Sequence, residues 1–380
     1  MAPIRICMIG LSARAKTSWA AEGHLPYLHS ERGRAKYSII ALCNFSVEAA
    51  QAAVKHFDLP ETTKTYGDPH DVANDPEIDL VVVNTRVDVH HVAAPSLRAG
   101  KDVWIEWPLA PNVKQAAELA DMGKSSGSRM VIGLQGRYAP IVQKLQEMIV
   151  VGVVGQVVSS DVRALRSVFP PNGIPASLEY FTDIRVGGNL ITVVFGHVID
   201  FIHATLGEFK NFSSRAQIQR PKVRLLSEKG CYIVDSDVPD VVFVNGELEP
   251  SSSVAHGATL SVNFRMEPAP FPGEPAFVWT IYGETGDIRV ISPDGPFLHT
   301  DSYGSPITIE VFDHATGGVV RHEWGWPDWQ LQFPPRARNT AELYEQFAMG
   351  TNGTCPDFDY AVKRHAEIDK VLEPFLKWYN

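Results

Sequence analysis

The first 140 residues alternate between two patterns of hydrophobic and polar positions. Short, mainly apolar runs are separated by alanine-rich stretches of helical length and spacing. The apolar runs are Ile4–Ile9, Ser38–Cys43, Leu80–Val83, Val103–Ile105 and Met130–Ile132. The helical stretches are Val47–Phe57, Val89–Ala99 and Val113–Gly127. This alternation predicts an α/β fold in which helices cover both faces of a doubly wound parallel sheet.

The pattern changes after Pro140. A predicted helix from Ile141 to about Val151 ends at Gly152, and alternating apolar and polar runs follow, separated by Pro, Gly and Ser. These runs are Gln156–Arg163, Ala258–Met266, Ala276–Tyr282 and Asp287–Ile291. They predict a second α/β domain with a large, open, mainly antiparallel sheet. Further helices are expected over Asn189–Leu206 and about residues 360–378, and this last helix could pack back on the first domain.

The length of 380 residues suits two domains, which we place at residues 1–140 and 141–380. A ligand is expected in the crevice between them. A net charge of -10 argues against direct nucleic-acid binding, because the mean surface field repels a polyanion. No apolar stretch reaches the roughly 18 residues of a membrane span, and the N-terminus lacks a signal-peptide pattern, so a cytoplasmic protein is expected.

The four cysteines, Cys7, Cys43, Cys231 and Cys355, are widely scattered and form no CxxC pair. We interpret them as reduced thiols of the core. No metal site is predicted.

Candidate nucleotide chemistry begins at Gly10, which ends the first predicted strand where a dinucleotide fold needs a tight turn beneath the pyrophosphate. The usual G-x-G-x-x-G spacing is absent. In its place is a loop whose hydroxyls, cations and helix-opening Ser18 could hold phosphate: Leu11, Ser12, Arg14, Lys16, Ser18 and Trp19. The alternative is a plain strand-to-helix turn with a solvated Arg and Lys.

The end of the second predicted strand bears on cofactor choice. Dinucleotide folds that select NAD carry an acidic residue here, whereas this chain has Asn44, followed by Ser46. Without the carboxylate a 2′-phosphate is not repelled, and Arg14 or Lys16 could bind it. We therefore expect NADP, with NAD as an alternative. An equally weighted interpretation is that Asn44 only caps the helix that begins near Val47.

The stretch Leu80–Leu109 resembles the glucose-fructose oxidoreductase and inositol dehydrogenase family. The resemblance lies in the strand LVVVNT, in His90, in the turn AGKDV and in Glu106-Trp107-Pro108, where the family has an E-K-P motif. Similar stretches are Gly133–Pro140, Gly187–Asp200, Gly283–Arg289 and Pro356–Phe358. The resemblance implies a Rossmann domain, a C-terminal α/β domain, a nicotinamide cofactor and, as is common in the family, a homodimer.

Several details resemble one branch of that family, typified by the fungal galactose-regulon repressor, which binds NADP and is not an enzyme. They are the long loop after Gly10, Ala41–Asn44, Glu106-Trp107, Leu134–Arg137 and the run from Asn189 to Asp200. The chain is compact and has no low-complexity insertion, so a shared ancestry does not establish a shared activity.

The family implies a lysine under the nicotinamide and an Asp and His four residues apart. Here Trp107 replaces the lysine, and Val193 stands four residues before His197. An indole cannot titrate, so Trp107 is expected to wall the nicotinamide or substrate pocket. His197 is the best remaining acid or base, although a core histidine is an equally weighted interpretation. Tyr180, Asp183 and Arg185 could replace the lost polar groups, or be exposed loop residues.

The predicted site therefore has two parts. The catalytic candidates are His197, Tyr180 and Asp183. The cofactor-binding candidates are the following: Gly10, Leu11, Ser12, Arg14, Lys16, Ser18, Trp19, Asn44, Ser46, Thr85, Arg86, His90, Glu106, Trp107 and Arg137. Arg137 could equally bridge the domains, and Asp200 is expected to orient the helix that carries His197. An aromatic set suits a substrate less polar than a free sugar: Trp107, Phe169, Tyr180, Phe181 and Phe195.

Three functions fit these residues. The first is an NAD(P)-dependent oxidoreductase with a rebuilt acid/base set, acting on a small molecule that bears a carbonyl or hydroxyl group. The second is an enzyme that keeps its nicotinamide bound and performs no net redox. The third is a regulator with a protein partner, located in the nucleus or cytoplasm, whose dinucleotide is a sensor or brace. The acidic net charge argues mildly against the third, because it would repel an acidic partner segment.

Overall fold

A computed structural model describes residues 2–15, 18–165, 173–269 and 271–379 of the chain. Their contacts divide them into two units. The first unit consists of residues up to 135, 185–188 and 329–366, and the second of residues 136–184, 189–328 and 367 onward. Two residues named above, Lys16 and Phe169, lie outside the described ranges. The domain boundary at residue 140 stays a prediction.

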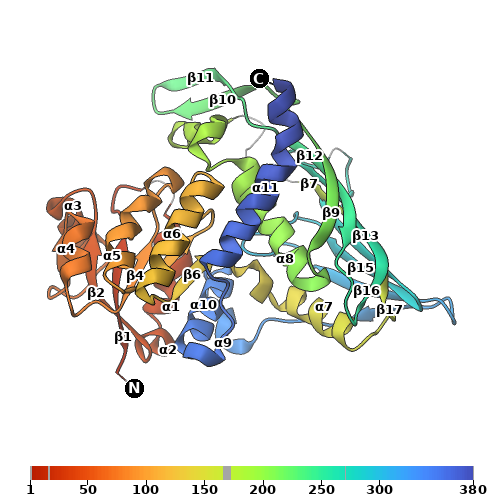
Figure 1. Ribbon diagram of the computed structural model, residues 1–380, viewed down its shortest axis with the longest axis horizontal. Helices are drawn as coiled ribbons and strands as arrows, with labels where there is room; N and C mark the ends of the chain where they lie inside the picture. Colours follow the sequence, from red (N-terminus) through yellow and green to blue (C-terminus); the bar gives the residue numbers. More distant parts are fainter. Residues whose placement is uncertain (1, 16–17, 166–172, 270, 380) are drawn as a thin grey trace. The chain divides into compact units, whose positions relative to one another are not determined.

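The first unit is built on a six-stranded sheet in which every neighbouring pair is parallel (Figure 1). The strand order is β3-β2-β1-β4-β5-β6. Successive strands are therefore added on one side of β1 up to β3, and on the other side from β4 onward. The strands are β1 (Ile4–Ile9), β2 (Tyr37–Cys43), β3 (Lys64–Tyr66), β4 (Leu80–Val83), β5 (Asp102–Glu106) and β6 (Met130–Gly133). This change of side creates the switch point at which such sheets bind ligands.

The helices of the first unit include counterparts of the three predicted ones, α3, α5 and α6, together with shorter helices that were not predicted. The helices of this unit are α1 (Leu25–Leu28), α2 (Glu31–Arg34), α3 (Val47–His56), α4 (Pro69–Asn74), α5 (Ala94–Arg98), α6 (Val113–Ser126) and α10 (Pro335–Ala348). The helix predicted over Val89–Ala99 begins instead as a 3₁₀ turn, Val87–Ala93, and becomes α-helical only at Ala94. Helix α10 was not predicted. Half of its residues are polar or charged, and the buried Tyr344 packs it on Trp104 of β5, with ring centroids 4.4 Å apart.

The second unit contains an eight-stranded sheet whose strand order is β17-β16-β15-β14-β7-β13-β12-β9. Only β7 and β13 pair in parallel; the other neighbours are antiparallel. The strands are β7 (Val157–Leu165), β9 (Phe209–Gln217), β12 (Val241–Leu248), β13 (Val254–Arg265), β14 (Phe277–Gly283), β15 (Gly286–Ser292), β16 (Thr308–Asp313) and β17 (Val319–His322). The predicted fold class, a Rossmann-type parallel sheet plus a largely antiparallel α/β domain, is confirmed.

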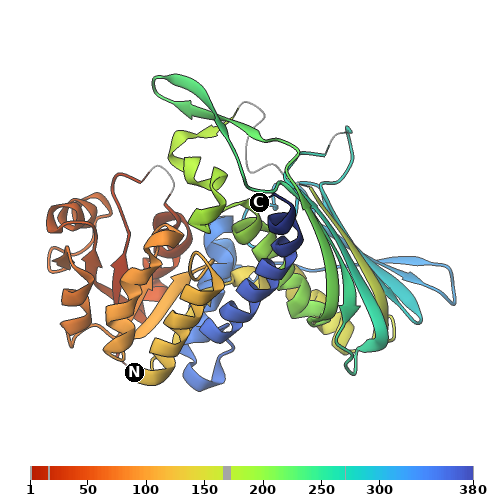
Figure 2. The same ribbon diagram turned by 45° about the horizontal axis from the view of Figure 1, so that its top comes forward.

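Helix α7 (Pro140–Val150) and helix α8 (Gly196–Leu206) lie against each other in the second unit, on one face of its sheet (Figure 2). Phe201 of α8 contacts Phe277 and Trp279 of β14, with ring centroids about 6 Å apart. The helix predicted over Asn189–Leu206 starts as a π-helical segment, Leu190–Phe195. Asn189 and Thr192 form a capping box at the N-terminus of this segment. Helix α9 (Asp328–Leu331) belongs to the first unit from Trp329 on, and α11 (Phe358–Tyr379) belongs to the first unit up to residue 366 and to the second unit from Glu367 on.

A small sheet of three strands, β8 (Ile174–Pro175), β10 (Lys222–Ser227) and β11 (Gly230–Asp235), completes the second unit. It corrects one prediction about the cysteines. Cys7 and Cys43 are buried thiols of the parallel sheet, but Cys231 is exposed because β11 is the edge strand of this hairpin, and Cys355 is half-buried. None of the helices in the described ranges is both long and apolar enough to cross a membrane.

Candidate functional site

The switch point of the parallel sheet is formed by Gly10, directly after β1, and Asn84, directly after β4. Gly10 has a φ of +95°, which disfavours any residue with a side chain. A Cβ at this position would lie 2.4 Å from the carbonyl oxygen of Asn84. Glycine is therefore required here on two independent grounds: its backbone conformation, and the close approach of the Asn84 carbonyl.

Buried polar atoms lack partners around this turn. Within the described part of the chain, neither Oδ1 nor Nδ2 of Asn84, nor Oγ1 of Thr85, nor Nε1 of Trp19 has a hydrogen bond. Buried polar groups of this kind are normally satisfied, so these four exceptions on three residues point to a ligand that supplies the missing partners. The chemistry of the set, two donors and two groups able to accept, suits the phosphates, ribose and carboxamide of a dinucleotide.

The loop after Gly10 has the polar character that was predicted for it. Leu11 is fully buried, whereas Arg14 is exposed and its backbone N–H donates to Oγ of Ser12 over 3.2 Å. The Ser18 side chain accepts from the N–H of Ala21 over 3.2 Å at the start of a π-helical turn, Ala20–His24. The loop thus leads into a helical N-terminus beside the switch point, the arrangement that binds phosphate in dinucleotide folds.

Asn44 and Ser46 have separate roles after β2. Nδ2 of Asn44 donates to the carbonyl of Leu11 over 2.9 Å, which ties the phosphate loop to the second strand. The cap of helix α3 is Ser46, whose Oγ accepts from the N–H of Ala49 over 3.2 Å. The alternative interpretation that Asn44 caps this helix is therefore wrong.

Three candidate cofactor-binding residues, Thr85, Arg86 and His90, follow β4 and differ in their exposure and contacts. Thr85 lies at the switch point, next to the exposed Arg86, whose guanidinium binds both carboxylate oxygens of Asp88 at 2.6 and 2.5 Å. His90 is buried, and its two ring nitrogens face the carbonyls of Thr85 at 3.0 Å and Leu109 at 3.2 Å. The imidazole of His90 therefore contacts the backbone of Thr85 and helps to fix its position. Burial lowers its pKa.

Glu106, at the end of β5, belongs to a chain of polar groups that sequence analysis missed. Its Oε1 accepts from Nε1 of Trp104 over 2.7 Å and lies 3.1 Å from Nε2 of His24. Nδ1 of His24 is in turn 2.8 Å from the hydroxyl of Tyr344. His24 and Tyr344 are fully buried, and burial raises the pKa of Tyr344 well above its ordinary value, so this hydroxyl keeps its proton. No sequence motif marks this set of polar groups, because its members come from three separate segments: the turn that ends at His24, strand β5 and helix α10.

Trp107, which replaces the lysine of the related motif, is 5% exposed. Its indole packs on His365 of α11, with ring centroids 4.7 Å apart and ring planes inclined by 41°. Trp107 thus forms an apolar wall and supplies no titrating group. His365 was not predicted as part of the site.

In the second unit His197 has a partner that was also missed. His197 of α8 and His299, from the segment after β15, stack with ring centroids 4.2 Å apart and an angle of 10° between the planes. Both are nearly buried. Gly136 lies against this pair, because a Cβ there would be 3.3 Å from the Cβ of His299.

The other candidates of the second unit lie on two different segments. Arg137 binds Asp200 of α8, with Nη2 2.5 Å from Oδ1 and Nε 3.4 Å from Oδ2, so this ion pair fixes the helix that carries His197. Tyr180 and Asp183 lie on and directly after a 3₁₀ segment, Ala176–Thr182. Both are half-buried, and the Tyr180 ring packs on Phe181 with centroids 4.8 Å apart.

Comparison with known proteins agrees with this geometry. Residues 4–134 match the family described as "Oxidoreductase family, NAD-binding Rossmann fold", and residues 140–292 match "Gal80p, C-terminal domain". These matches assign the protein to the class of oxidoreductase-family proteins that have an NAD-binding Rossmann fold. The chain belongs to the glucose-fructose oxidoreductase and inositol dehydrogenase family, near its Gal80-like branch.

Its relatives include both a dehydrogenase and a regulator. The dehydrogenase aclE of Aspergillus oryzae is 29% identical over 80% of this chain and 82% of its own length. The galactose/lactose metabolism regulatory protein GAL80 of Kluyveromyces lactis is 26% identical over 76% of this chain, but the match spans only 64% of that protein. Among solved structures, a super-repressor mutant of Gal80p from Saccharomyces cerevisiae has a TM-score of 0.85 at 21% identity, covering 99% of this chain and 97% of that one. That likeness shows the fold alone.

Proposed function

We propose that the first unit binds a nicotinamide dinucleotide and that the protein is an oxidoreductase-family enzyme acting on a small molecule with a carbonyl or hydroxyl group. The observation that carries the proposal is the switch point itself. Gly10 lets the ends of β1 and β4 approach closely, and within the described residues buried polar atoms of Asn84 and Thr85 beside it, and of Trp19 further along the loop, have no hydrogen bond. When bound, a nicotinamide ring accepts a hydride from carbon or returns one.

The residues present fit such a cofactor. The backbone after Gly10, with Ser12, Arg14 and Ser18, would hold the pyrophosphate. Asn84, Thr85 and Trp19 would bind ribose and phosphate oxygens, and Glu106 would accept from a hydroxyl near the end of β5. We infer NADP as the preferred cofactor, because the position after β2 has no carboxylate and Arg14 places a positive charge in the exposed loop. NAD remains the alternative.

The preference for NADP has a direct test in Asn44→Asp. A carboxylate at this position repels a 2′-phosphate and accepts from ribose hydroxyls, so the ratio of NADP to NAD affinity should fall at least tenfold. The variant also loses the bond to the Leu11 carbonyl, for which Asn44→Ala is the control: it should weaken both cofactors alike. An unchanged ratio in Asn44→Asp would refute the NADP preference.

We propose His197 as the acid/base group, with His299 as its stacked neighbour. A bound nicotinamide would supply the hydride acceptor for alcohol oxidation, and the His197 imidazole would take the proton of the substrate hydroxyl. Reduction of a carbonyl runs in reverse. Trp107 supplies no proton. His197 and a bound nicotinamide would also suit a redox-neutral reaction, in which the substrate undergoes no net oxidation or reduction. The aromatic character of Trp107, Tyr180 and Phe181 favours a substrate less polar than a free sugar.

The decisive experiment identifies any dinucleotide that purifies with the full chain and follows its redox state with panels of alcohols and ketones. Turnover with one of them, reduced about 10²- to 10⁴-fold in His197→Phe with unchanged cofactor affinity, would support the enzyme. His256→Phe, an exposed histidine of β13, is the matched control and should retain full activity. Turnover that is unchanged in His197→Phe would contradict the role of His197.

A second function has its own observation in its favour. The loss of the lysine to Trp107 and the match of residues 140–292 to the Gal80p C-terminal domain favour a regulator that binds the dinucleotide without turning it over. In that case the protein would bind a protein partner in the nucleus or cytoplasm. A retained dinucleotide that no substrate oxidises or reduces, together with capture of a defined protein partner, would favour this function. For either function we propose a homodimer that binds neither nucleic acid nor membrane.

A further inference from the structure

We propose that His203, Glu208 and Glu367 of the second unit bind a divalent transition-metal ion, with Zn²⁺ the best match. Nε2 of His203 lies 2.8 Å from Oε1 of Glu367 and 3.9 Å from Oε2 of Glu208. One ligand atom from each residue falls within 4.8 Å of the other two. Ligands bound to one Zn²⁺ at about 2.0–2.2 Å are spaced in this range, so a small shift of the side chains would bring all three onto one ion.

The second ring nitrogen of His203 makes the contact that metal-binding histidines usually make. Nδ1 is 2.7 Å from the carbonyl oxygen of Gly207, which can only accept, so Nδ1 carries the proton. Nε2 is thereby directed at the two carboxylates. A backbone or carboxylate partner on the far nitrogen fixes the tautomer and the ring orientation in most histidine–metal sites.

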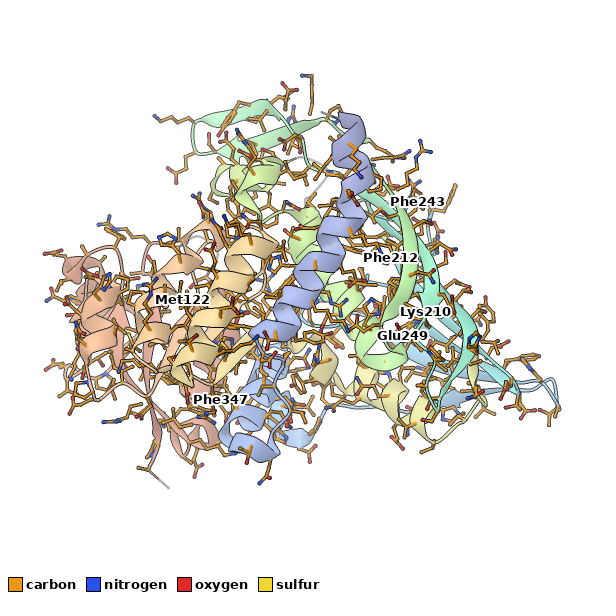
Figure 3. The ribbon with its side chains drawn as sticks, viewed as in Figure 1. Met122, Lys210, Phe212, Phe243, Glu249 and Phe347 are labelled. Atoms are coloured by element: carbon orange, nitrogen blue, oxygen red, sulfur yellow. The ribbon has the colours of Figure 1, made fainter. Side chains whose placement is uncertain are left out.

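The local backbone supports this arrangement. Helix α8 ends at Leu206, and Gly207 adopts a φ of +88°, which turns its carbonyl back toward His203. The next residue is Glu208, whose backbone oxygen accepts from the N–H of Glu249 over 2.9 Å. Figure 3 labels Glu249 and Lys210 near this end of α8. The position of Glu208 is therefore set by the sheet as well as by the helix terminus.

Burial and charge narrow the kind of ion. The His203 side chain is fully buried, that of Glu367 is 10% exposed and that of Glu208 is 22% exposed, so the site has an inner wall and one side open to solvent. Two carboxylates and one imidazole offer a mixed O/O/N set, which suits Zn²⁺ and not the all-oxygen coordination of Mg²⁺ or Ca²⁺. Three protein ligands leave room for water to complete a tetrahedron.

Sequence analysis predicted no metal site, because these ligands form no compact motif. His203 and Glu208 come from the end of a helix and the loop after it, and Glu367 comes from a helix far along the chain. The competing explanation of the cluster is an ion pair between a charged His203 and Glu367 without a metal. In that case Glu208 contributes little, because 3.9 Å is too long for a hydrogen bond to His203.

The test is a Zn²⁺ titration of the full chain after removal of metals with a chelator. Calorimetric titration, and competition with a chromophoric chelator followed by absorbance, should each show one tightly bound Zn²⁺ per chain. Co²⁺ bound in place of Zn²⁺ should give visible d–d absorption. Glu208→Gln should weaken Zn²⁺ binding by more than about tenfold without unfolding the protein, and His203→Gln should abolish it. Glu249→Gln removes the same charge from a neighbouring residue outside the cluster and should bind as the wild type does.

Circular dichroism and melting in chelator would establish that each variant is folded, and Zn²⁺ should raise the melting temperature of the wild type and of Glu249→Gln only. The proposal is overturned if the wild type takes up no stoichiometric Zn²⁺. It is equally overturned if Glu208→Gln binds Zn²⁺ as tightly as the wild type, because the ion then lies elsewhere.

Discussion

The Trp107 indole rests on the imidazole of His365, with ring centroids 4.7 Å apart. The residue that replaces the family's lysine is thus packed against a second unpredicted group, and neither side chain offers a charge. Burial, together with the nearby His90, lowers the pKa of His365 to about 3. The position that carries an ammonium group in related proteins is therefore neutral and apolar in this one.

The buried His365 should make stability depend on pH. A histidine titrates near 6.5 in the unfolded chain, so between pH 6.5 and 3 the unfolded state binds a proton that the folded state does not. Above pH 6.5 this residue has no effect on the pH dependence of stability. Below pH 6.5 it lowers the free energy of unfolding as the pH falls, by about 2 kcal/mol at pH 5. His365→Phe keeps a ring on Trp107 and should lose that part of the pH dependence.

Melting temperatures of the wild type and the variant at pH 5 and pH 7 measure this effect. The difference between the two pH values should shrink by a few degrees in His365→Phe. The exposed His91→Phe serves as control and should behave as the wild type. If His365→Phe and the wild type lose equal stability on acidification, the buried neutral histidine is not the cause.

Gly10 and Gly127 allow the cofactor cradle to be separated from backbone strain. Both glycines have positive φ, +95° and +75°, so replacement by alanine costs about 1–2 kcal/mol at either position. Only the Cβ at position 10 meets an obstacle, the Asn84 carbonyl; nothing lies within 4 Å of the one at position 127. Gly10→Ala would force the Asn84 carbonyl out of place at the switch point, so it should abolish detectable dinucleotide binding, whereas Gly127→Ala should lower stability alone. Calorimetric titration with NADP and NAD checks both, and equal affinity in the two variants would refute the cradle.

The contact between His24 and Tyr344 should be energetically coupled. Since Tyr344 keeps its proton, it donates to Nδ1 of His24 and leaves Nε2–H to face Glu106. Tyr344→Phe and His24→Phe should each lower the free energy of unfolding by about 1–3 kcal/mol, because each leaves a buried polar partner unsatisfied. The double variant should lose less than the sum. Urea denaturation of the four proteins measures the coupling, and strict additivity would show that the two side chains act independently.

The parallel sheet was predictable because its strands are short apolar runs of fixed length, and β1 and β4 occur with the expected bounds. The edge strand β3 was missed because Lys64–Tyr66 is only three residues long and half-buried. Likewise β9 and β12 carry weak alternation, and their pairing depends on partners distant in the sequence. Half of the residues of helix α10 are polar or charged, and contacts from Tyr344 that no local pattern reveals hold it in place.

The candidate site divides in the same way. Gly10 and Asn44 could be proposed because strand ends fix where a dinucleotide fold needs a turn and an anchor. His24, His299 and His365 could not, because each gains its meaning from a ring or carboxylate contributed by another segment: Glu106, His197 and Trp107 respectively. The cofactor-binding role of His90 stays a prediction; its two ring nitrogens face backbone carbonyls, which sequence spacing cannot foretell.

The central claim is that the switch point at Gly10 and Asn84 holds a nicotinamide dinucleotide, and direct binding tests it. The purified full chain, stripped of any retained nucleotide, would be titrated with NADPH and NADH while nicotinamide fluorescence and heat are recorded. We expect saturable binding of one dinucleotide per chain, tighter for NADPH than for NADH and lost in Gly10→Ala. Folded protein that binds neither form at saturating concentration would contradict the account.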